Sequence, residues 1–153
     1  MTPDDPLVRY YLRHSSVMRL ATVSGRGRPA VTPLWFVVDR GRLVTSTGAS
    51  TLAARNAVVE PRVQLLLDAE TAGRSRYLLC LGGVAVVRDG LPPLRVLARF
   101  ATRYYLHPRG LAVELAHVRQ WPLRSRYYGQ SSAAWIAIEP TSAELVRRPQ
   151  PHW

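Results

Sequence analysis

Short runs of apolar, β-branched and aromatic residues, separated by turn-forming residues, recur along most of this sequence. In Val17–Val23 apolar and polar or small residues alternate, which is typical of a strand with one buried face. Six further runs are interpreted as strands: Ala30–Val38, Leu43–Thr47, Arg62–Asp68, Tyr77–Arg88, Ser131–Glu139 and Ser142–Arg147. The connections are mostly of hairpin length, and this favours an antiparallel sheet. So many short strands predict a mainly β fold that closes into a barrel.

Three segments with helical features interrupt the predicted strands: Leu7–His14, Leu52–Val59 and Leu94–Leu106. Ser50 or Thr51 is the expected cap of the second of these. The third places Tyr104 on an apolar face at helical spacing, so we expect Tyr104 in the core. Pro33 indicates an edge strand or a bulge, and Gly82–Gly83 indicates a bulge or bend.

The length of 153 residues suits one domain. We expect a single barrel domain over residues 1–147 and a mobile tail over 148–153. The first residues do not resemble a secretory signal, and the longest apolar run, Leu78–Val87, is about half of what a spanning helix needs. These features predict a cytoplasmic protein that does not enter a membrane.

The formal net charge is +11, and all 21 basic residues are arginine. Such an excess favours anionic partners, although arginines scattered over a surface also serve solubility alone. Nucleic acid is the least expected partner, because no dense basic block or binding motif is present. Cys80 lies in an apolar run and is expected in the core. The four histidines are far apart in the sequence, so no metal site is predicted.

One segment combines features of an anion site. Ser46, Thr47, Ser50 and Thr51 surround the point where a predicted strand leads into a predicted helix. A helix start offers unpaired amide groups and partial positive charge. Arg55 lies four residues after Thr51, on the same helix face. This corner is either a phosphate site or an ordinary capped helix. The apolar segment Val31–Phe36, expected to pair with Leu43–Thr47, would add a wall for a flat ring.

At these residues the sequence resembles the pyridoxamine 5'-phosphate oxidase-like family of split-barrel flavoproteins, including its deazaflavin-dependent branch from actinobacteria. The resemblance is carried by Leu20–Val23, Arg28–Pro29, Pro33–Val37, Ser46–Gly48, Ala54–Asn56 and Pro61–Val63, and more weakly by Trp135–Val146. It implies a six- to seven-stranded antiparallel split β-barrel with two or three inserted helices. It also implies a homodimer with a cofactor, FMN or deazaflavin coenzyme F-420, in a groove at the subunit interface.

By the family pattern, Thr32, Pro33, Leu34 and Trp35 would border the ring of the cofactor. The residues that would reach its ribityl chain and phosphate are Ser46, Thr47, Ser50 and Thr51, with Arg55 and Asn56 alongside. This sequence departs from the pattern at Ala53, where many members carry a phosphate-binding lysine. Arg55 or another arginine would have to supply that charge.

The leading hypothesis is an oxidoreductase that transfers a hydride between the bound cofactor and a small organic substrate. The cofactor carries such chemistry, so no catalytic residue is assigned. Tyr127 or Tyr128 is a candidate proton donor. The alternative is a protein that binds or sequesters a flavin, haem or another tetrapyrrole without turnover. In that case His107 or His117 is the candidate axial ligand.

Overall fold

The computed structural model describes residues 1–69, 76–106 and 132–149. Their strands are β1 Val17–Val23, β2 Pro29–Trp35, β3 Val37–Asp39, β4 Arg42–Gly48, β5 Arg62–Leu67, β6 Tyr77–Asp89 and β7 Ala133–Arg147. Their helices are α1 Pro6–His14, α2 Leu52–Val59 and α3 Leu94–Phe100, the last continued by a π-helical turn, η1, at Ala101–Tyr105. The prediction of a mainly β fold is confirmed.

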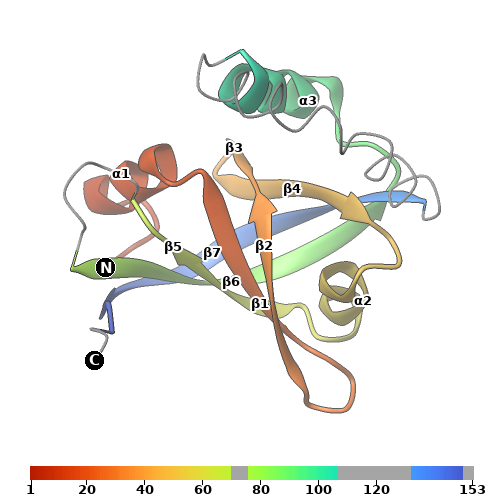
Figure 1. Ribbon diagram of the computed structural model, residues 1–153, viewed down its shortest axis with the longest axis horizontal. Helices are drawn as coiled ribbons and strands as arrows, with labels where there is room; N and C mark the ends of the chain where they lie inside the picture. The colour runs from red at the N-terminus through yellow and green to blue at the C-terminus, as the bar shows by residue number, and fades with distance from the viewer. Residues whose placement is uncertain (70–75, 107–131, 150–153) are drawn as a thin grey trace.

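All seven of these strands belong to one antiparallel sheet in the order β2-β1-β5-β6-β7-β4-β3. The sheet curls into a split β-barrel, and its two ends approach each other where β2 passes β4 (Figure 1). Helix α2 packs against β1 and β6, while α3 lies beyond β3 (Figure 1). Within the described residues no helix is long and apolar enough to cross a membrane.

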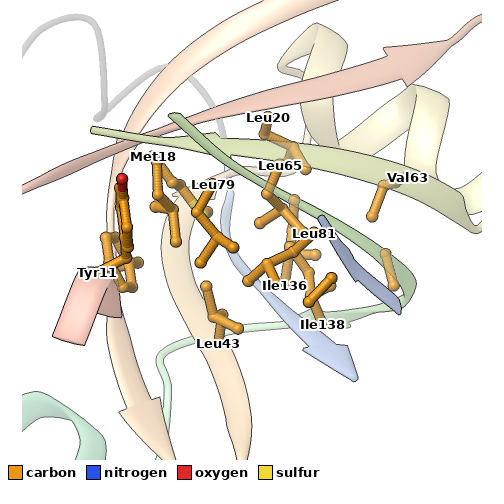
Figure 2. Packing of buried hydrophobic residues seen from close by; sticks show 14 of the residues in the cluster. Tyr11, Met18, Leu20, Leu43, Val63, Leu65, Leu79, Leu81, Ile136 and Ile138 are labelled. Carbon is orange, nitrogen blue, oxygen red and sulfur yellow. The ribbon is translucent and has the colours of Figure 1, made fainter. Parts of the chain in front are cut away.

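The main core fills the concave side of the sheet (Figure 2). Alternation along β1 turns Met18 and Leu20 inward, and both side chains are fully buried. They pack with inward residues of the other strands, among them Leu43, Leu65, Leu79, Leu81, Ile136 and Ile138 (Figure 2). Burial of these side chains contributes about 1.5–3 kcal/mol each to folding.

A second, smaller cluster lies between the sheet and α3. It contains Val37, Val44, Val96, Tyr104 and Ala137, with Trp35, Phe100 and Trp135 packed against it. Tyr104 is only 7% exposed, so the expectation that it is a core residue is confirmed. The segment around α3 is therefore an integral layer of the domain and covers the outer face of β3 and β4.

The expected strand Ala30–Val38 is in fact two strands, because Phe36 interrupts it. The expected pairing of Val31–Phe36 with Leu43–Thr47 is also wrong. Strand β2 pairs with β1, and it is β3 that pairs with β4. Pro33 is tolerated because β2 is an edge strand, as its sequence indicated.

The two strands expected at the C-terminal end are one continuous strand, β7. Pro140 does not end it, because Pro140 stands opposite Gly83, where the register between β6 and β7 shifts. The bulge predicted from Gly82–Gly83 is thus confirmed, and it accommodates the proline. Beyond β7, Arg148 forms an ion pair with Asp68 at 2.6 Å, while residues 150–153 of the expected tail lie outside the described residues.

Candidate functional site

The corner between β4 and α2 is held by hydroxyl groups. Thr51 caps α2: its Oγ1 accepts a hydrogen bond from the amide of Ala54 at 3.3 Å and donates to the carbonyl of Gly48 at 2.8 Å. Thr47 Oγ1 lies 3.1 Å from Thr51 Oγ1. The Thr51 hydroxyl therefore has three partners within the protein and shapes the corner; its contact with a ligand stays a prediction.

The start of α2 nevertheless presents a donor to a ligand. The amide groups of Leu52 and Ala53 have no acceptor within the part of the chain that the structure describes, and of these two residues only Leu52 is exposed. The side chains of Ser46 and Ser50 are exposed on either side of the corner. Unpaired amides at a helix start and nearby hydroxyls suit an anion such as a phosphate.

Beside this corner lies a cavity of about 490 Å³ between α2 and the turn that joins β1 to β2. We call it the hairpin hollow. It begins at Leu52, the first residue of α2, and its lining includes Arg26 and Arg28 from the turn and Arg55 from the helix. Among the described residues, no acidic side chain lines it. Three exposed arginines thus line one hollow that reaches the helix start.

Arg26 and Arg28 are the two members of this arrangement that sequence reasoning missed. Ser24–Pro29 has the composition of a plain turn, and it does form one: the Gly27 amide donates to the Ser24 carbonyl at 2.8 Å, with Gly27 at a φ of 76°. The missing signal was spatial. Only the packing of α2 against β1 brings the turn to the helix that carries Arg55.

Asn56, a predicted ligand residue, is committed to the fold. It is 5% exposed, and its Nδ2 donates to Thr22 Oγ1 of β1 at 3.1 Å. Ala53 is 1% exposed and belongs to the main core cluster. A lysine at position 53 would have to direct its chain out of this core, whereas the three arginines of the hairpin hollow are exposed.

The residues expected to border a ring all lie at the end of β2. Thr32 and Leu34 are half-buried, and Pro33 is exposed. Trp35 is already in contact with other rings: it stacks on Tyr104 with centroids 4.6 Å apart and planes 4° apart, and Tyr105 meets its edge. Trp35 is therefore engaged within the fold, while Thr32, Pro33 and Leu34 are partly or fully exposed on the edge strand.

Cys80 is not the core residue that its apolar run suggested. It is half-buried on β6, opposite Glu144 of β7, and its thiol donates to Gln64 Oε1 at 3.4 Å. Burial raises the pKa of the Cys80 thiol, and the charge of Glu144 raises it further.

We expect iodoacetamide to alkylate Cys80 slowly at neutral pH, because the reactive thiolate is disfavoured there. Glu144→Gln removes the negative charge beside Cys80. The pKa of the thiol should then fall, and the rate of alkylation should rise about threefold. Glu139→Gln, on the same strand but opposite Val84, is the matched control and should leave the rate unchanged. Equal rates in the wild type and Glu144→Gln would contradict this explanation.

The other residues that sequence reasoning considered are Tyr127, Tyr128, His107 and His117, and all four lie outside the described residues. Within the described ranges, no group of three histidine, cysteine or acidic side chains is arranged to hold a metal ion.

Comparison with known proteins agrees with this architecture. The sequence matches the pyridoxamine 5'-phosphate oxidase family over residues 5–146. The chain therefore belongs to that family, as its motifs suggested. No curated protein matches the sequence itself.

Several solved structures share the fold. The haem storage protein HutZ from Vibrio cholerae is 19% identical, with a TM-score of 0.64 over 96% of this chain and 95% of that one. A conserved hypothetical protein from Mycobacterium tuberculosis is 19% identical, with a TM-score of 0.66 over 94% of this chain and 84% of that one. An F420 reductase is 18% identical, with a TM-score of 0.60 over 88% of this chain and 93% of that one. At such identities the likeness concerns the fold alone.

Proposed function

We propose that this protein binds FMN or deazaflavin coenzyme F-420 and is an oxidoreductase subunit that transfers a hydride between that cofactor and a small organic substrate. The supporting observation is that Leu52, whose amide at the start of α2 has no acceptor among the described residues, lines the same hollow as three arginines. Amide donors and arginines together form strong, charge-assisted contacts with phosphate.

In this proposal the anionic end of the cofactor lies at the amide of Leu52, and Arg55 contacts it from the hairpin hollow. The side chains of Ser46 and Ser50 are placed to reach the ribityl chain. The ring would lie toward Thr32, Pro33 and Leu34 at the open side of the barrel. The bound cofactor supplies the redox chemistry, while these residues hold it and exclude water.

The split between β2 and β4 leaves this site open on one side. We propose that a second copy of the chain covers it in a homodimer, which is common in the family. The deazaflavin carries an anionic glutamyl tail in addition to its phosphate. A hollow with three arginines and no acid in its lining favours the cofactor that carries more negative charge.

To test the proposal, the purified protein would be titrated with FMN and with F-420, and binding followed by fluorescence. We expect a Kd below about 10 μM for at least one of them, a common range for bound small molecules. The triple variant Arg26→Gln, Arg28→Gln, Arg55→Gln should weaken binding about a hundredfold, since each charge-assisted contact contributes on the order of 1 kcal/mol at an exposed site.

Arg88→Gln is the matched control, because Arg88 is an exposed arginine of β6 that does not line the hairpin hollow. It should leave both affinities unchanged. If the triple variant loses more affinity for F-420 than for FMN, the glutamyl tail of F-420 is the group that contacts the arginines. If neither cofactor binds at tens of micromolar, the assignment is wrong.

The second candidate is haem binding without turnover, and it is supported by the likeness of the fold to the haem storage protein HutZ. The described part of the chain contains one histidine, His14, whose ring lies 4.4 Å from that of Tyr10. A titration with haemin separates the two candidates. A Soret band that saturates at one haem per chain, without binding of either flavin, would favour this second function.

A further inference from the structure

A second cavity, separate from the hairpin hollow, lies between α1 and α3. It has a volume of about 480 Å³, and β3 forms its floor. We call it the helix groove. Its size falls within the range of roughly 300–1,000 Å³ that is usual for small-molecule sites. It shares no lining residue with the hairpin hollow, so the two can be tested independently.

Of the residues that the structure describes, four arginines and no acidic residue line the helix groove. Arg9 and Arg13 come from α1, where they are four residues apart and share a face. Arg99 and Arg103 come from α3 and η1 with the same spacing. Like charges at this spacing destabilise a helix slightly, and here two such pairs line one cavity. A bound anion would relieve this repulsion.

The two arginines of α3 and η1 are already used by the fold. Arg99 donates to the carbonyl of Val38 at 2.7 Å and lies 3.7 Å from the Asp39 carboxylate. Arg103 donates through Nη2 to the carbonyls of Leu12 and Ser15. These contacts hold Arg99 and Arg103 in fixed positions along one wall of the helix groove.

The two arginines of α1 are less committed. Arg9 donates to the carbonyl of Asp4 at 3.0 Å, which is an exposed contact. For the Arg13 side chain the described residues provide no hydrogen-bond acceptor. Arg13 lies in the last turn of α1, where a positive charge suits the helix dipole. The dipole does not account for Arg9, which is a full turn closer to the N-terminus.

Between these charges the surface of the helix groove is apolar. Leu12, Val37, Val38 and Ala98 supply it, and Val37 is 2% exposed within the second core cluster. An apolar surface surrounded by arginines fits a ligand that has an apolar body and an anionic group. Simple inorganic anions would leave the apolar part uncovered, while neutral apolar molecules would leave the guanidinium groups unpaired.

We propose that the helix groove binds a small amphipathic anion, in which a carboxylate or phosphate group is joined to an apolar body. The anionic group meets Arg9 and Arg13, whose planar guanidinium groups match either acid in a bidentate manner. The apolar body lies on Val38 and Ala98. This site is additional to the proposed cofactor site and does not depend on a cofactor being bound.

The test uses decanoate and decyl phosphate as probes in isothermal titration calorimetry of the full chain. We expect a Kd on the order of 100 μM for at least one of them, and the tighter probe identifies the preferred anionic group. Acetate lacks the apolar body and decanol lacks the anionic group, so each should bind at least tenfold more weakly. The bound probe should also raise the midpoint of thermal unfolding.

Two variants probe the two halves of the site. Arg9→Gln combined with Arg13→Gln should weaken the tighter probe at least tenfold. Ala98→Phe places a ring in the helix groove from an exposed position of α3, and should block binding while the charges remain. Arg88→Gln, outside the groove, should have no effect on probe binding. Circular dichroism confirms that each variant is folded.

Several results would overturn the proposal. These are no binding of either probe, binding that the double arginine variant leaves intact, or an equal loss in Arg88→Gln. Association with phosphatidylglycerol vesicles without binding of the dissolved probes would assign the arginines to a membrane surface instead. A protein that binds neither FMN nor F-420 but still binds decanoate would refute the proposed function and leave this inference standing.

Discussion

Replacing Gly83 with alanine is expected to destabilise the protein by about 3 kcal/mol, the upper part of the usual range for overpacking. A Cβ at this position would lie 2.7 Å from Cγ2 of Ile138 and 2.9 Å from the carbonyl oxygen of Glu139. The second of these atoms belongs to the backbone of β7, so relief requires the two longest strands to separate at their bulge. Chemical denaturation of the variant and the wild type measures the difference.

Gly25→Ala is the matched control. A Cβ there would meet only Cγ1 of Val59, at an ordinary contact distance of 3.4 Å, and Gly25 has no positive φ. Its stability should stay within about 0.5 kcal/mol of the wild type, or rise slightly because the unfolded chain loses freedom. If Gly83→Ala is as stable as Gly25→Ala, the close packing of β6 on β7 at the bulge is not what restricts position 83 to glycine.

Features that depend on neighbouring residues could be predicted from the sequence. Helix α2 has the predicted bounds of Leu52 and Val59, and Thr51 is its cap, as expected. The bulge was predicted because two adjacent glycines interrupt an otherwise apolar strand. In each case the residues that determine the structure lie within a few positions of one another, and local steric and hydrogen-bond rules are sufficient.

Features that depend on distant residues could not be predicted in the same way. The run from Ala30 to Val38 has the composition of one strand. It is divided at Phe36 because the backbone of Phe36 bonds to the side chain of Tyr104, 68 residues later. Composition also gave no indication that β2 and β4 lie toward opposite ends of the sheet, with four other strands between them. The pairing of strands is set by the closure of the whole barrel.

The same distinction applies to the candidate site. The helix start was predicted because caps and unpaired amides are local features. The roles of Asn56 and Trp35 depend on the groups they meet, Thr22 and Tyr104, which come from other elements. Arg26 and Arg28 have no distinctive local pattern, and only the position of α2 beside their turn gives them significance. Site residues whose function depends on tertiary neighbours require the structure.

Tyr104→Phe should lower the free energy of unfolding by about 3 kcal/mol, although it removes a single oxygen atom. That oxygen accepts from the amide of Phe36 at 3.0 Å, and its proton lies between the carbonyls of Phe36 and Ser16, each 2.8 Å away. Phe36 is fully buried, so without the hydroxyl its amide and carbonyl are left without these bonds in an apolar surrounding. Each unsatisfied buried group costs about 1–3 kcal/mol. Thermal unfolding should show a midpoint lower by about 10 °C, as expected for a chain of this size.

Tyr11→Phe is the comparison that separates this mechanism from a general effect of losing a tyrosine hydroxyl. Tyr11 is as buried as Tyr104, and its hydroxyl donates to the partly exposed carbonyl of Tyr77 at 3.0 Å rather than to the backbone of a fully buried residue. Its loss should cost about 1 kcal/mol. The ring stack between Tyr104 and Trp35 remains in Tyr104→Phe, so the near-ultraviolet circular dichroism of Trp35 should keep its sign. Equal destabilisation by the two variants would mean that the Tyr104 hydroxyl does not hold the break between β2 and β3. The layer formed by α3 and η1 would then be attached to the barrel by its apolar contacts and by the hydrogen bonds of Arg99 and Arg103.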